Sequence, residues 1–144
     1  MDSYPGAGSC DAIKSLKTYL LFAVPQNVVW CMGMNDGSDT DSTTPSSAWL
    51  SAFNELESIS KIFGFEIIVA TIPSVPNIYH EGQNFYVRNS GYRVVDFAKA
   101  VGASSDGTWF GNMLSTDDVH PSNTGAMALY MRFLADFPEI MISD

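Results

Sequence analysis

Asp117 and His120 are the two residues whose types and spacing most directly suggest chemistry. They lie three positions apart in the segment Asp117-Asp118-Val119-His120-Pro121, so the carboxylate can fold back onto the imidazole. A carboxylate in that position fixes the tautomer of the ring and stabilises the imidazolium when histidine acts as a general base. The same pair could also be an exposed histidine beside solvated acids, and spacing alone leaves both interpretations open.

A second candidate is Asn35, in the segment Gly33-Met34-Asn35-Asp36 that directly follows an apolar run. A side-chain amide there can point into a cleft and stabilise the oxyanion of an acyl-transfer intermediate. Such a donor is worth about 2.7–4 kcal/mol. Asparagine, aspartate and glycine are also common in plain turns, which is the alternative interpretation.

The third candidate is the glycine-rich turn Pro5-Gly6-Ala7-Gly8-Ser9, ahead of an expected helix. Glycines at the start of a helix leave backbone N–H groups open to an anion. The turn could therefore donate hydrogen bonds to a negatively charged ligand, although a flexible start of chain explains it equally well.

Hydrophobic periodicity and capping residues predict the elements that would position these residues. We expect helices over 9–24 with Ser9 as N-cap, from a cap at Thr44 to Gly64, over 81–89, and from Ser122 onward. The last helix is predicted to bury Ala126, Tyr130, Phe133, Leu134 and Phe137. Short apolar runs predict strands over 28–33, 65–72 and 92–97.

Alternation of helices with apolar strands predicts an α/β fold with a parallel sheet, because helices cover both faces of such sheets. The 144 residues suffice for one compact domain, and we assign 1–144 to a single domain. Ligands of such sheets bind at the carboxyl ends of the strands. Asn35 and the loop before the last helix should therefore lie at the same edge.

In this order along the chain, the three candidate segments resemble the blocks of the SGNH hydrolases, also called GDSL esterases and lipases. The segment from Gly33 to Asp36 is similar to the third block of the family, and the segment from Asp117 to Pro121 to the fifth. Gly8, or else Gly6, matches the glycine of the second block. Asp118 replaces a small residue that is often found there.

The resemblance implies a three-layer α/β/α sandwich of flavodoxin-like type and hydrolysis of small esters, including acetyl esters of carbohydrates or lipids. It implies that Asn35 and the backbone N–H of Gly8 are the oxyanion donors. It also implies that His120 is the general base and Asp117 its orienting partner, without a cofactor or a metal.

The chain departs from the family at its start, where a Gly-Asp-Ser block should follow a first strand. Asp2-Ser3 imitates part of that block, but too few residues precede it to form the strand. We therefore expect a partial domain without its first strand or strands, and a nucleophilic serine upstream of residue 1. The chain alone should be nearly inactive, and the open edge of the strand at 28–33 could form a homodimer.

Composition restricts the partners. The net charge is -9 with seven Lys and Arg, which argues against nucleic-acid binding and against an anionic membrane surface. No run is long enough to span a bilayer, and the first residues lack a signal-peptide pattern, so the compartment stays open. Cys31, inside an apolar run, is predicted to be a core residue, and His80 an exposed one.

Three other kinds of function fit parts of the pattern. One is a degenerate family member that kept the fold for interaction only, against which an upstream Gly-Asp-Ser after a buried strand would argue. A phosphate- or sugar-binding module on the same fold would use the glycine-rich turn, but it leaves the Asp-x-x-His segment unexplained. Calcium binding by Asp36, Asp39 and Asp41 begins with the spacing of an EF-hand loop, but lacks its glycine and terminal glutamate. A solvated acidic loop is the simpler interpretation of these aspartates.

Overall fold

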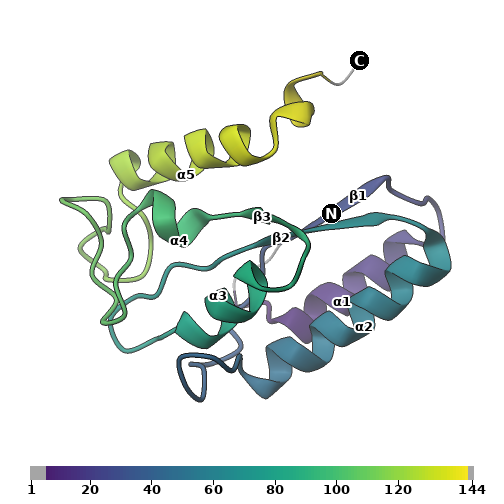
Figure 1. Ribbon diagram of the computed structural model, residues 1–144, viewed down its shortest axis with the longest axis horizontal. Helices are drawn as coiled ribbons and strands as arrows, with labels where there is room; N and C mark the ends of the chain where they lie inside the picture. The colour runs from purple at the N-terminus through teal and green to yellow at the C-terminus, as the bar shows by residue number, and fades with distance from the viewer. Residues whose placement is uncertain (1–5, 143–144) are drawn as a thin grey trace.

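The computed structural model describes residues 6–142, which form an α/β fold around a three-stranded parallel sheet. The strands are β1 (Asn27–Trp30), β2 (Glu66–Ala70) and β3 (Arg93–Val95), and they lie side by side in that order (Figure 1). Val28 pairs with Ile67 in the β1–β2 ladder. The predicted α/β class and parallel sheet are confirmed.

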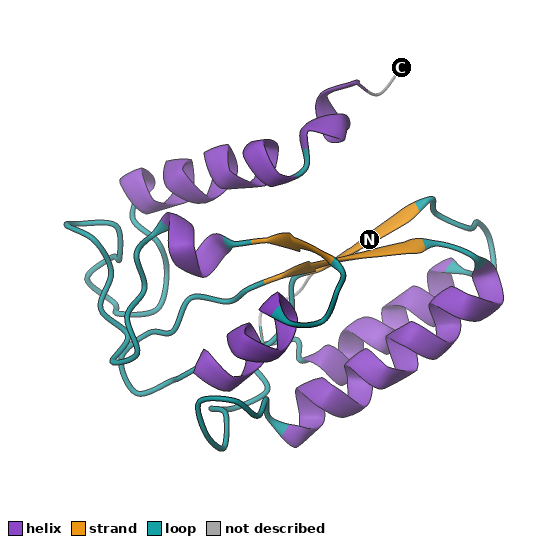
Figure 2. Cartoon of the chain, in the orientation of Figure 1, coloured by secondary structure: helices purple, strands orange, loops and turns teal. Residues whose placement is uncertain are grey.

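Helices lie on both faces of this sheet (Figure 2). One layer holds α1 (Ser9–Tyr19), α2 (Ser47–Phe63) and α3 (Glu81–Arg88). The other holds α4 (Phe97–Ala100) and α5 (Asn123–Asp136), after which the chain ends in a 3₁₀ helix, η1 (Pro138–Ile142). Across residues 6–142, every helix is too short or too polar to span a lipid bilayer.

The larger core lies between the sheet and the first layer, and α2 contributes most to it. Its apolar stripe is buried at Trp49, Ala52, Phe53, Leu56 and Ile59. The rings of Trp49 and Phe53 stack with centroids 4.8 Å apart. Each large apolar side chain buried in this way stabilises the fold by about 1.5–3 kcal/mol.

Several boundaries differ from the predicted ones. Gly8, not Ser9, is the N-cap of α1, and α1 ends at Tyr19 because residues 20–22 form a turn, in which the Leu21 and Phe22 N–H groups donate to carbonyls three residues earlier. Ser46, not Thr44, is the N-cap of α2, where its hydroxyl accepts a hydrogen bond from the Trp49 N–H. The predicted C-terminal cap at Gly64 is confirmed, and so is the predicted start of the last helix near Ser122, which is its N-cap.

The strands are shorter than predicted, and the segment expected to end the third one is helical. Phe97 begins α4, whose N-cap Asp96 accepts a hydrogen bond from the Lys99 N–H. A helix of four residues is too short to show a hydrophobic period, so the sequence pattern did not reveal it.

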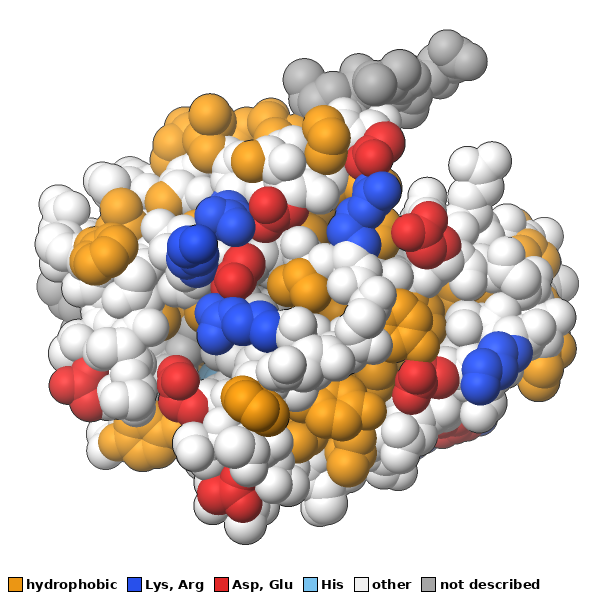
Figure 3. All heavy atoms as spheres, in the orientation of Figure 1, with side chains coloured by type: hydrophobic (Ala, Val, Ile, Leu, Met, Phe, Trp, Pro, Cys, Tyr) orange, Lys and Arg blue, Asp and Glu red, His pale blue; other side chains and the backbone are white. Residues whose placement is uncertain are grey.

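The predicted burial of α5 is largely wrong. Of the five residues expected to be buried there, only Phe137 is, and Tyr130 is 56% exposed. Phe133 and Phe137 pack on the face of β2 and β3, because this narrow sheet offers no surface to the rest of the helix. Apolar side chains therefore gather at the molecular edge formed by α5 (Figure 3), among them Met127 and Met131.

Within residues 6–142, β1 has a neighbouring strand on one side only. Its free edge carries unpaired backbone groups, and the exposed Leu21 and Phe22 precede it. Residues 18–35 include no charged side chain, so a second copy could approach this edge without the repulsion expected for a chain of net charge -9.

We expect the chain to self-associate through the β1 edge, with a second copy as the partner. Asn27→Lys, at the exposed position of β1, should shift the equilibrium toward monomer, because a lysine on an edge strand opposes strand pairing. Sedimentation velocity over a wide concentration range measures this. Ile62→Lys, on the exposed side of α2, is the control and should not change association. A wild-type monomer at all concentrations would contradict the expectation.

Candidate active site

The loop between α4 and α5 folds back on itself and presents Asp117 and His120 together. The Ser115 N–H donates to the His120 carbonyl at 2.9 Å, and Leu114 and Pro121 form an isolated antiparallel bridge. The turn is tight enough that Asp118 takes a left-handed conformation, with φ of 58°. Aspartate tolerates that conformation better than most residues, although glycine tolerates it best.

Asp117 holds the imidazole of His120 through a direct contact. Its Oδ2 lies 2.6 Å from His120 Nδ1, and its Oδ1 accepts hydrogen bonds from the Ser115 hydroxyl and the His120 backbone N–H. These donors hold the pKa of the Asp117 carboxyl well below its usual range. The contact occupies Nδ1, so the exposed Nε2 is the ring nitrogen left to take a proton.

Asn35 is positioned by an anchored backbone just before it. The Met32 carbonyl accepts hydrogen bonds from Gln83 Nε2 at 2.8 Å and from Trp49 Nε1 at 3.1 Å. Gly33 follows with φ of 142°, and a Cβ there would lie 2.3 Å from the Gln83 amide. Only glycine allows this close approach, which turns the chain out of β1 and toward the sheet edge.

The two expected oxyanion donors lie beside each other. Asn35 Nδ2 donates to the Ala7 carbonyl at 3.0 Å, and this uses one of the two N–H donors of the amide. The Gly8 N–H donates to Asp11 Oδ2 at 3.1 Å, within the capping box of α1. Asn35 therefore has a donor left for a ligand, whereas an anion at Gly8 would compete with the Asp11 carboxylate.

Asp36 joins the Asn35 loop to the start of α1, a role that the sequence did not reveal. Its carboxylate accepts hydrogen bonds from the Ser9 N–H at 2.8 Å and from the Ser9 hydroxyl. A negative charge at a helix N-terminus is favourable, because it satisfies free N–H groups and opposes the helix dipole. Asp36 thus fixes the relative placement of Gly8 and Asn35.

Asp36→Ala should lower the free energy of unfolding by about 1–2 kcal/mol, the cost typical of losing an N-terminal cap. Thermal or urea denaturation measures this. Asp41→Ala is the matched control, because the Asp41 carboxylate accepts hydrogen bonds from Thr43 and Thr44 within its own exposed loop. Equal effects of the two substitutions would contradict the anchoring role.

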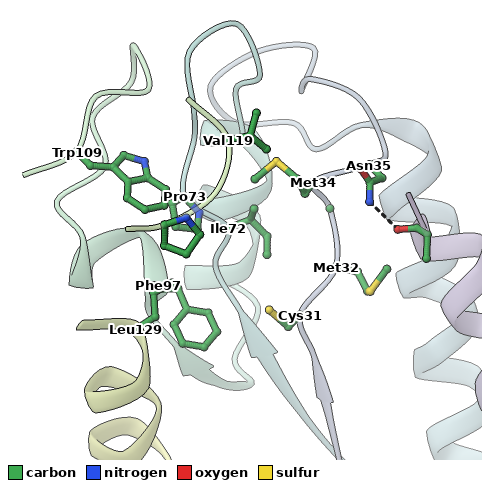
Figure 4. Close-up of a pocket in the computed structure, with 13 residues that line it drawn as sticks. Cys31, Met32, Met34, Asn35, Ile72, Pro73, Phe97, Trp109, Val119 and Leu129 are labelled. Atoms are coloured by element: carbon green, nitrogen blue, oxygen red, sulfur yellow. Dashed lines mark hydrogen bonds between the residues drawn. The ribbon is translucent and has the colours of Figure 1, made fainter. Parts of the chain in front are cut away.

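A pocket of about 360 Å³ brings the two halves of the site together (Figure 4). Asn35 and Ala7 line it from the side of β1 and α1, and Val119 and Pro121, on either side of His120, line it from the loop. Asn35 and the loop that carries His120 therefore both border a pocket at the carboxyl edge of the sheet, whereas the exposed side chains of Asp117 and His120 are not among the residues that line it.

Cys31 lies on the floor of this pocket and not in the core as predicted. The pocket is open, so the thiol is accessible, yet the apolar side chains around it desolvate a thiolate and raise its pKa to about 11. The thiol therefore stays un-ionised near neutral pH and is a weak nucleophile.

The three aspartates between residues 36 and 41 make structural hydrogen bonds. Asp36 binds Ser9, Asp39 accepts from the backbone N–H groups of Ser46 and Gln83, and Asp41 accepts from Thr43. Their carboxylates thus serve separate backbone donors. No group of three His, Cys, Asp or Glu side chains in residues 6–142 could hold a metal ion.

His80 is buried, and its predicted exposure is wrong. The side chain is 0% exposed, and neither ring nitrogen has a hydrogen-bond partner in the part of the chain that the structure describes. This burial lowers the pKa of His80 from 6.5 to about 4, and the negative charge of Asp36 opposes the shift only in part. The ring is therefore neutral in the folded protein near neutral pH.

Acid should destabilise the fold through His80. The unfolded chain protonates this histidine below pH about 6.5, whereas the folded protein does so only below about 4. The contribution of the neutral His80 ring to the free energy of unfolding is complete above pH 6.5. As the pH falls to 4, about 3 kcal/mol of this contribution is lost. Urea denaturation at several pH values, compared with His80→Phe, measures it. Parallel pH profiles for the two proteins would contradict the assignment.

No protein-family model and no curated protein matches the sequence. Among solved structures, the fold is similar to that of a protein assigned to the G-D-S-L lipolytic family, from Desulfitobacterium hafniense DCB-2. The TM-score is 0.70 at 14% identity, over 91% of this chain and 76% of that chain. The likeness shows that the fold resembles a G-D-S-L hydrolase structure. At this sequence identity it assigns no role to individual residues.

Proposed function

We propose that this chain supplies the base and the oxyanion-binding part of a serine ester hydrolase. The observation that carries the proposal is the 2.6 Å contact between His120 Nδ1 and Asp117 Oδ2, beside the pocket that Asn35 lines. An oriented histidine and an amide donor at one cleft are the groups that acyl transfer through a serine requires.

Each residue then has a defined task. His120 Nε2 takes the proton of the serine hydroxyl as that oxygen attacks the ester carbonyl, and later gives it to the leaving alcohol. Asp117 keeps the imidazole in the tautomer that allows this and stabilises the imidazolium. Asn35 donates its free N–H to the oxyanion, and the Gly8 N–H joins it where the oxyanion replaces the Asp11 carboxylate.

The nucleophilic serine is the component of this mechanism that we do not assign to residues 6–142. Among residues 6–142, no serine hydroxyl forms a hydrogen bond with His120 Nε2, and Ser115 instead donates to Asp117. Ser3, which imitates part of the family's first block, lies outside the described residues. We propose that the serine belongs to sequence upstream of this chain, so that these 144 residues alone hydrolyse esters poorly or not at all.

Hydrolysis of a chromogenic butyrate ester tests the proposal in two proteins. The 144-residue chain should show little turnover, and the protein extended by its native upstream sequence should show turnover through an acyl-serine intermediate. Strong activity of the shorter chain that Ser3→Ala abolishes would place the nucleophile at Ser3. Equal, low activity of both proteins would contradict the proposal.

The phosphate- or sugar-binding module draws no support from the pocket. A phosphate site would be expected to hold a basic side chain or free backbone donors. The Gly8 N–H is taken by Asp11, and none of the pocket-lining side chains within residues 6–142 is charged. Titration with inorganic phosphate separates the two functions: binding that depends on Gly8 and ignores His120 would favour the module.

A further inference from the structure

The pocket that Asn35 lines is mostly apolar. Its walls are mostly apolar side chains from several separate segments of the chain, among them Met34, Ile72, Phe97, Trp109 and Leu129. None of its lining residues carries a charge. Trp109 Nε1 already donates to the Ser74 carbonyl at 2.8 Å, so the indole does not offer this donor to a ligand.

The polar amide and the apolar side chains lie toward opposite ends of the pocket. Asn35 stands at one end, where its amide can meet a carbonyl oxygen (Figure 4). Phe97, Leu129 and the Cys31 thiol lie deeper, toward the sheet and α5. A ligand with a carbonyl at one end and an apolar tail would match this arrangement, because each part meets groups of its own kind.

The volume of the pocket discriminates between short and long acyl groups. The volume of about 360 Å³ lies in the range of pockets that hold small-molecule ligands, roughly 300–1,000 Å³. An acetyl group would leave most of it filled only by water against apolar walls. A charged acyl group would lose its hydration with no side chain of opposite charge to meet it.

We propose that this pocket is the acyl-chain site and that the substrate is an ester of an uncharged, apolar acyl group much longer than acetyl. The proposal rests on the ester-hydrolase function above and specifies its substrate class. The ester carbonyl sits at Asn35, next to the loop of His120, and the acyl chain extends past Met34 and Val119 toward Phe97 and Leu129.

Binding of neutral, non-hydrolysable carbonyl compounds tests the proposal without requiring turnover. We would titrate the 144-residue chain with 2-alkanones from 2-butanone to 2-decanone and follow backbone and Asn35 side-chain amide signals by NMR. Affinity should rise about fourfold for each added methylene until the pocket is full. The signals that shift should belong to Asn35 and to residues that line the pocket.

Two variants locate the tail of the ligand. Leu129→Gln should weaken 2-decanone binding about tenfold, because a polar amide would then face the chain, and should spare 2-butanone. Cys31→Phe should fill the floor and shorten the longest ketone that binds well. Met127→Gln, on the exposed side of α5, is the matched control and should change nothing. Circular dichroism checks that each variant folds.

The outcomes separate this inference from the function on which it rests. A flat chain-length profile, or shifts away from the pocket, would overturn the acyl site even if ester hydrolysis proved to depend on His120. Chain-length-dependent binding together with hydrolysis that ignores His120 would keep the apolar site and refute the proposed catalytic role.

Discussion

His120→Ala should lower kcat for ester hydrolysis by at least about 10⁴-fold in the protein that carries the nucleophile. Without the imidazole, the described residues that line the pocket offer no base for the serine proton, and Asp117 is held ionised by hydrogen-bond donors and points at the ring. The measurement is steady-state hydrolysis of a chromogenic ester, with Tm as a check of folding.

His80→Phe provides the matched control for this experiment. It removes the other histidine of the chain, which is buried and whose ring has no hydrogen-bond partner within residues 6–142. It should leave kcat near the wild-type value at neutral pH. Retained activity in His120→Ala, or equal losses in both variants, would contradict the role of His120 as the base.

Asn35→Ala should lower kcat by about 10²–10³-fold and change KM little, because an oxyanion donor acts mainly in the transition state. The structure supports this effect, because one amide N–H is fixed on the Ala7 carbonyl and the other remains for the oxyanion. Steady-state kinetics at several substrate concentrations separate kcat from KM.

Asn35→Asp tests the same donor with almost the same shape. The carboxylate has no N–H and would repel the oxyanion, so the loss in kcat should equal or exceed that of Asn35→Ala. Asn89→Asp, at the exposed end of α3, is the control and should leave kcat unchanged. A rise in KM alone would contradict this role, because it would mean that Asn35 binds the ground state and the transition state equally.

The parts of the site that sequence could predict are local in the chain. Asp117 and His120 are three residues apart, so a single turn brings their side chains together. The strand before Asn35, the cap at Gly64 and the start of the last helix near Ser122 were also predictable, because apolar runs and capping residues act over short distances.

The parts that sequence missed depend on contacts between distant residues. Asp36 meets Ser9 across 27 positions, and Gln83 meets the Met32 carbonyl across 51. No local pattern signals such pairs. The burial of His80 and the exposure of α5 were missed for the same reason, since each depends on which surfaces the rest of the fold provides.

The central claim is that Asp117, His120 and Asn35 serve a nucleophilic serine, and active-site labelling tests it most directly. A fluorophosphonate probe would be applied to the protein with its native upstream sequence, followed by peptide mass spectrometry. We predict one labelled serine outside residues 6–142, with labelling lost in His120→Ala and kept in His80→Phe. Labelling that does not depend on His120, or a labelled serine within residues 6–142, would contradict the account.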